Sequence, residues 1–221
     1  MSNAMTPSRF STTGVLLSLG LVSSAIAWLL IATPVLTFSS AGLKHHLGHF
    51  GLTYFHAAMG TILLFLGLAN LYIGSTRKHF KYHKVVGRLY LFGGGLGVVA
   101  AMVITSAVSH LPGVAHTFSN MSISLLTLSS AWLVAAGMAY RAVRNRRFES
   151  HREWMIRSYV LVWAFVFCRL ASRVPSVGAM GDGEAFIWLS WVGPLLVAEL
   201  ALQWQAGAGI AVKSSPLRGA A

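Results

Sequence analysis

Residues 51–74, GLTYFHAAMGTILLFLGLANLYIG, contain no lysine, arginine, aspartate or glutamate. As a helix this stretch would be about 36 Å long, which exceeds the roughly 30 Å hydrocarbon core of a bilayer. Five further stretches have a comparable length and composition once their polar ends are removed, at residues 14–38, 84–108, 117–140, 153–175 and 185–206. The sequence therefore predicts an all-α polytopic membrane protein, a bundle of six transmembrane helices in which spans two to five form the core.

The composition of the 221 residues agrees with this class. Hydrophobic residues make up 55% of the chain and charged residues 10%, against about a quarter in soluble domains. A single cysteine, Cys168, excludes an intrachain disulfide, a four-thiolate metal site and a Cys-x-x-Cys-His haem attachment. There is no Gly-x-Ser-x-Gly elbow and no pair of carboxylates placed for acid–base work, so no catalytic residue is predicted.

The basic residues indicate the orientation of the predicted spans. The net charge is +12, and nearly all lysines and arginines fall on the side that holds the N-terminus. Positive loops stay in the cytoplasm, so we expect both termini there, as residues 1–12 and 208–221 around one transmembrane domain at 13–207. Met1–Ala4 before Met5 is typical of an expression-tag remnant. The basic loops suit anionic lipid headgroups, so we expect the bilayer as partner and no nucleic acid.

Four histidines each belong to a different predicted span and alternate between the two membrane faces: His56, His83, His116 and His151. Antiparallel neighbours place His56 with His116 at one face and His83 with His151 at the other. A b-type haem needs two imidazoles on opposite sides of its plane, held by facing helices. The pattern predicts one haem per pair and electron exchange with a quinone or a small reductant. The alternative is that histidines at helix ends face water and headgroups.

Two arginines on the cytoplasmic side are expected to bind the haem propionates. Arg88 and Arg157 follow His83 and His151 in the sequence, and guanidinium groups pair well with carboxylates.

A metal site is the competing interpretation on the non-cytoplasmic side. On a helix beginning near Gly42, three histidines would share one face, namely His45, His49 and His56. His110 is predicted on the same side of the membrane. Imidazoles suit zinc, copper or iron. About 11 Å of helix rise would separate His45 from His56 at opposite ends of this face, so a single ion would bind the compact pair His45 and His49. Together with an intramembrane glutamate they would suit a divalent-metal-binding or transport protein, in which Pro194 could interrupt a helix.

Two ionisable residues lie inside predicted spans, Arg169 in the fifth and Glu199 in the sixth. Such residues are candidates for function by default. Their levels in the membrane differ by about 12 Å, which is too far for direct contact. Glu199 is closer in level to Arg157 and Arg88, so we expect its partner among these arginines.

Three blocks of sequence resemble one bacterial family: HAAMG at 56–60, HKVVGRLY at 83–90 and HREWMIRSY at 151–159. It is an uncharacterised family of multi-spanning membrane proteins known by a domain-of-unknown-function label. The resemblance extends from about His56 to Glu199 and implies an integral protein of a bacterial inner membrane, with no established activity. One histidine per helix on alternating sides is similar, more loosely, to the four-histidine, two-haem transmembrane cytochromes b.

Overall fold

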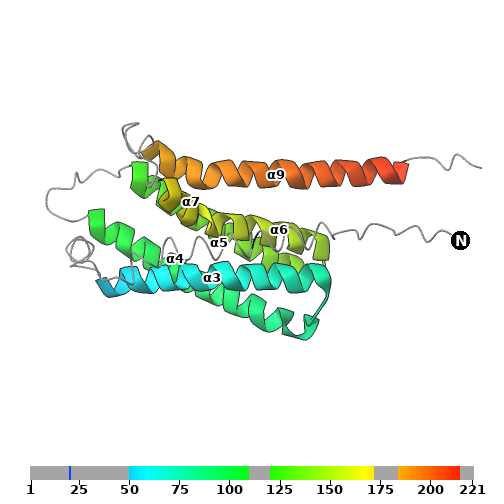
Figure 1. Cartoon of the computed structure of the whole chain (residues 1–221), viewed down its shortest axis with the longest axis horizontal. Coiled ribbons are helices and arrows are strands. Elements are labelled where there is room, and N and C mark those ends of the chain that lie inside the picture. The colour runs from blue at the N-terminus through cyan, green and yellow to red at the C-terminus, as the bar shows by residue number, and fades with distance from the viewer. Residues whose placement is uncertain (1–19, 21–49, 110–119, 172–183, 215–221) are drawn as a thin grey trace, which may run out of the picture. The chain divides into compact units, whose positions relative to one another are not determined.

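The computed structural model describes residue 20 and residues 50–109, 120–171 and 184–214 (Figure 1). In these residues every regular element is helical and no strand occurs. The elements are α3 (Phe50–Thr76), the 3-10 turn η1 (Phe80–Tyr82), α4 (His83–Ser109), α5 (Asn120–Arg144), α6 (Phe148–Val162), α7 (Ala164–Ala171) and α9 (Glu184–Ser214). The chain divides into two compact units, residues 1–97 and 98–221, with the boundary inside α4.

Four helical segments are long and apolar enough to cross a membrane: Gly51–Thr76, Phe80–Ser106, Asn120–Arg144 and Ala185–Ala206. They coincide with predicted spans two, three, four and six. The predicted first span, 14–38, lies outside the described residues except for Gly20. The all-α polytopic class is therefore confirmed, with four of the six predicted spans meeting this criterion as single helices.

The fifth predicted span is two helices in succession. α6 ends at Val162 and α7 begins at Ala164, with Trp163 between them. The backbone N–H of Trp163 donates to the Val160 carbonyl at 3.1 Å, and the Trp163 carbonyl accepts from Phe167 at 3.0 Å. The break is thus a local tightening to an i−3 hydrogen bond, and the ladder resumes after it. The break divides the span into two shorter helices, although no proline lies at this point of the sequence.

Pro194 does not interrupt its helix. α9 runs without a break from Glu184 to Ser214 through this proline, contrary to the expectation that it could open a helix interior. Proline in a transmembrane helix is tolerated when neighbouring groups satisfy the backbone that it frees. The transport hypothesis relied on Pro194 to make this helix discontinuous, and α9 is continuous at that position.

In the first unit, glycines allow α3 and the first half of α4 to approach closely. A Cβ added to Gly97 would lie 3.5 Å from the Met59 Cβ, and one added to Gly93 would lie 3.9 Å from a Leu63 methyl. At Gly95, no side chain of the described residues lies within 4 Å of such an atom. Every fourth residue of α4 here therefore faces α3, which is the small-residue packing common between membrane helices.

In the second unit, α5 packs along α6, and α9 contacts α5, α6 and α7. The buried face of α5 is made mostly of small side chains: Ser124, Ser129, Trp132, Ala135, Ala136, Ala139 and Ala142. The Trp191 indole on α9 donates a buried hydrogen bond to the Ser124 hydroxyl at 3.0 Å. A direct polar bond of this kind holds two helices together where lipid offers no hydrophobic driving force.

Large apolar side chains cover the outer faces of these helices. Exposed examples occur on α4, α5 and α9: Phe92, Val99, Val134, Leu200 and Trp204. Soluble monomers rarely expose apolar surface on this scale. Lipid acyl chains are the environment that these faces suit.

Candidate functional site

The best-defined histidine is His56, in the second turn of α3. Its Nδ1 lies 2.9 Å from the carbonyl oxygen of Gly97 on α4. A carbonyl only accepts hydrogen bonds, so Nδ1 carries the proton and donates. In the neutral ring, Nε2 then holds the lone pair. This is the arrangement in which a backbone carbonyl orients an imidazole for ligation of a metal through Nε2.

His151 has the same arrangement in the second unit. It is the fourth residue of α6, and its Nδ1 lies 2.9 Å from the carbonyl oxygen of Ala139 on α5. The same argument assigns the proton to Nδ1 and the lone pair to Nε2. Both rings are half-buried, and each is bonded to the backbone of a neighbouring helix. Packing of neighbouring helices thus contributes to the orientation of both rings.

His83 is held by ring contacts at the start of α4. Its ring stacks on Phe80, with centroids 5.1 Å apart and an interplanar angle of 10°. The Arg77 guanidinium carbon lies over the Phe80 ring, 5.4 Å from its centroid. A Cβ added to Gly74 would come within 3.3 Å of the His83 Cε1. The absence of a side chain at Gly74 therefore leaves the room that the imidazole occupies.

His56 and His83 lie beside different levels of α4. His83 begins this helix, and Gly97, the partner of His56, follows 14 residues later. At 1.5 Å a residue the levels differ by about 21 Å, within a hydrocarbon core of about 30 Å. His56 and His83 therefore belong to opposite leaflets if α4 crosses the membrane along its normal.

Arg157 and Glu199 form the ion pair that the comparison of levels predicted. The Arg157 Nε donates to Glu199 Oε2 at 2.8 Å and its Nη2 donates to Oε1 at 3.1 Å, which is a bidentate contact between α6 and α9. Glu153 lies 3.6 Å from the same guanidinium. The Trp154 ring centroid is 4.8 Å from its Cζ. With two carboxylates and one ring around it, Arg157 links helices and has little capacity left for a propionate.

The remaining predicted site residues divide by position. Arg88 is on α4 and exposed, and Arg169 is on α7. Four histidines named in the haem and metal hypotheses lie outside the described residues, namely His45, His49, His110 and His116. His56 is the one member of the proposed metal group that the structure describes. Within the described ranges, no three histidine, cysteine or acidic side chains come together as a metal site.

Reasoning from the sequence missed a buried amide in the first unit. Asn70 on α3 is only 3% exposed, and its Oδ1 has no hydrogen-bond partner among the described residues. A Cβ on Gly87 would lie 3.4 Å from its Nδ2. The signal was present, since Asn70 is the one amide in the apolar stretch 51–74. The carbonyl partners at Gly97 and Ala139 carried no such signal, because any residue supplies a carbonyl.

Comparison with known proteins places the chain in a family. No curated protein matches it. No solved structure matches it either. A family described as "Predicted membrane protein (DUF2306)" matches residues 53–202, which include the three histidines and the Arg157–Glu199 pair described above. Because the match covers more than half of the 221 residues, the chain belongs to the DUF2306 family of predicted membrane proteins.

Proposed function

We propose that this protein is a membrane redox protein that binds b-type haem through histidines on its helices. The observation that carries the proposal is the hydrogen bond from His56 Nδ1 to the Gly97 carbonyl, which leaves the Nε2 lone pair as the ligating atom. Histidines that ligate metals almost always donate their other ring N–H to such an acceptor. His151 makes the equivalent bond to Ala139.

The pairing of ligands stays the one predicted from the sequence, His56 with His116 and His83 with His151. The difference of about 21 Å between the levels of His56 and His83 along α4 supports one haem in each leaflet. Bound haem would supply one-electron transfer, and the helices would hold its axial ligands. Arg88 remains the proposed propionate partner, because Arg157 is engaged by Glu199 and Glu153.

The first test is a visible absorption spectrum of the full chain purified in detergent from haem-replete cells. The air-oxidised protein should show a Soret band, and dithionite should sharpen the bands of a six-coordinate b-type haem. The amount of haem per chain distinguishes one site from two. A colourless protein would contradict the proposal.

Substitution of His56 locates the haem. His56→Ala should remove at least half of the bound haem, because it deletes one axial ligand. His79→Asn is the matched control, since His79 is exposed and its left-handed backbone (φ 55°) suits asparagine. An unchanged spectrum in His56→Ala would show that this histidine is not a ligand.

A further inference from the structure

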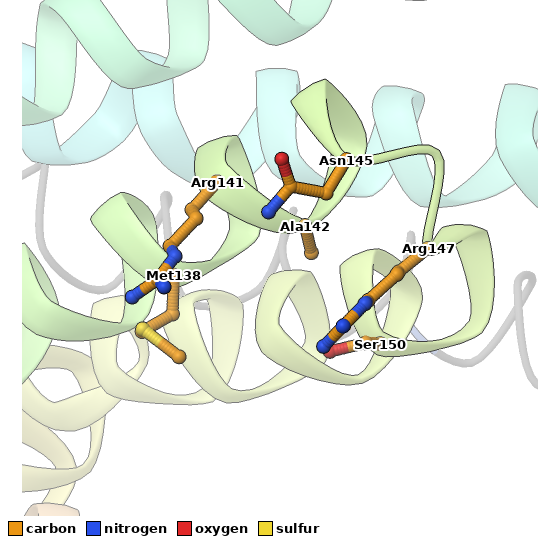
Figure 2. A pocket seen from close by; sticks show the side chains of 6 residues that line it. All are labelled: Met138, Arg141, Ala142, Asn145, Arg147 and Ser150. Atoms are coloured by element: carbon orange, nitrogen blue, oxygen red, sulfur yellow. The ribbon is translucent and has the colours of Figure 1, made fainter.

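A basic hollow lies at the turn between α5 and α6. It has a volume of about 240 Å³ and is lined by Met138, Arg141, Ala142, Asn145, Arg147 and Ser150. Figure 2 shows Arg141 with Met138 to one side of Ala142 and Arg147 with Ser150 to the other. Pockets for drug-sized ligands measure about 300–1,000 Å³, so this hollow suits a smaller group. Its lining combines two guanidinium groups with an amide and a hydroxyl.

The two arginines of the hollow have no counter-charge within the described part of the chain. The three glutamates whose side chains are described there all lie against other arginines: Glu149 is 4.0 Å from Arg152, and Glu153 and Glu199 lie against Arg157. The whole chain has only five acidic residues. Among the described side chains, therefore, no carboxylate neutralises Arg141 and Arg147, and both guanidinium groups are open to an anion.

The backbone of the turn is arranged for an anion as well. The N–H groups of Arg146 and Arg147 donate to the Val143 and Ala142 carbonyls at 3.1 and 2.9 Å, which covers carbonyl oxygens that would repel an anion. α6 begins at Phe148, and its N-cap side chain makes no capping hydrogen bond. The N–H groups of its first turn, which borders the hollow through Ser150, thus keep their donor capacity.

The hollow also lies at the end of a membrane-spanning segment. The apolar segment of α5 ends at Arg144, between the lining residues Arg141 and Asn145. Arginine side chains at such a position reach into the headgroup layer. Phosphate groups are the anions that occur at high density there, and a guanidinium binds their oxygens in a bidentate manner.

We propose that this hollow binds a phosphate group, carried either by an anionic phospholipid or by a soluble phosphate. Arg141 and Arg147 supply the charge, and Asn145 and Ser150 add hydrogen bonds. The site is independent of the proposed haem, because it uses none of the histidines.

The test measures phosphatidylglycerol and phosphatidylcholine binding to the full chain in detergent by native mass spectrometry. Phosphatidylglycerol should bind the wild-type chain about tenfold more tightly than phosphatidylcholine. The double variant Arg141→Gln/Arg147→Gln should lose this factor of about ten, because each charge-assisted hydrogen bond contributes a tenfold effect or more. Arg144→Gln/Arg152→Gln removes the same charge outside the hollow and should change the affinity less than about threefold.

Competition with inorganic phosphate identifies the source of the group. Displacement of the lipid by millimolar phosphate, or binding of phosphate without the lipid, assigns a soluble ligand. Retention of the lipid assigns the headgroup. Equal losses in the two double variants would overturn the proposal, because they would show attraction by net charge alone. The proposal would also be overturned if the wild-type chain neither preferred phosphatidylglycerol to phosphatidylcholine nor bound inorganic phosphate.

A single substitution guards against misfolding of the double variant. Asn145→Asp places a carboxylate at the exposed edge of the hollow. Aspartate, like asparagine, is compatible with the backbone at the end of a helix, so the fold should be retained. It should abolish phosphate binding while the far-ultraviolet circular dichroism stays unchanged. Full retention of binding by this variant would contradict the site.

Discussion

Two arginines occupy backbone conformations that usually belong to glycine. Arg77 follows α3 with φ 59°, and Arg146 follows α5 with φ 58°. The Arg77 N–H donates to the Ile73 carbonyl, and the Arg146 turn closes by the two bonds of a Schellman motif. An L-residue in this region costs roughly 1–2 kcal/mol. A guanidinium at the negative end of a helix dipole offsets part of that cost.

Relief of this strain should be measurable at Arg146. Arg146→Gly should raise the free energy of unfolding by about 1 kcal/mol relative to Arg146→Ala, because both variants lose the charge and only glycine lacks the Cβ. Thermal unfolding in detergent measures the difference. Equal stability of the two variants would show that the left-handed backbone is not strained.

At individual positions, the sequence predicted a contact that depends on how far along its helix each residue lies. It did not predict features that depend on the local backbone conformation. The Arg157–Glu199 pair followed from counting residues from the span ends, because both helices rise by 1.5 Å a residue. The left-handed turn at Arg146 did not follow, since its usual marker is glycine or asparagine. The acceptors of His56 and His151 depend on how two helices are rotated against each other, which one sequence does not specify.

The contact between α3 and α4 depends on which glycines face it. Gly97→Leu should destabilise the protein by about 1–3 kcal/mol, because the Met59 Cβ leaves no space beyond a first side-chain atom. The substitution would also strain the neighbouring His56–Gly97 hydrogen bond. The midpoint of thermal unfolding measures the loss.

Gly95→Leu is the matched control for that prediction. It adds the same side chain two residues away, where the described part of the chain places no neighbouring group within 4 Å of the new Cβ. Leucine is also a better helix former than glycine, so stability should stay equal or rise. A similar loss in both variants would mean that α4 does not use Gly97 to approach α3.

For the whole molecule, the spans were the most predictable feature. A bilayer requires about 20 apolar residues of helix, so length and composition alone located α3, α4, α5 and α9. The division of the fifth span at Trp163 was not predictable, because no proline or glycine marks it. The basic hollow depends on the fold of a turn, although the arginines around Asn145 were visible in the sequence.

The predicted orientation can be tested by labelling of single cysteines. In a Cys168→Ser background, Tyr82→Cys and Phe148→Cys introduce cysteines at exposed positions of the two basic turns. Both should react with a membrane-impermeant maleimide in inverted vesicles and stay unlabelled in intact spheroplasts, because positive loops remain cytoplasmic. Lys44→Cys, which is predicted on the other side, should react in spheroplasts. Labelling of the two turns from opposite sides would refute the arrangement of spans.

The left-handed arginines also bear on how the chain enters the membrane during synthesis. A helix hairpin that slips too deep would bring its turn into the lipid, and an arginine at the bilayer centre costs about 2.5–3.5 kcal/mol. Arg77 and Arg146 are held at the ends of α3 and α5 by hydrogen bonds that form within each hairpin. A charged residue fixed at each turn therefore opposes movement of that turn into the hydrocarbon core while the hairpin inserts.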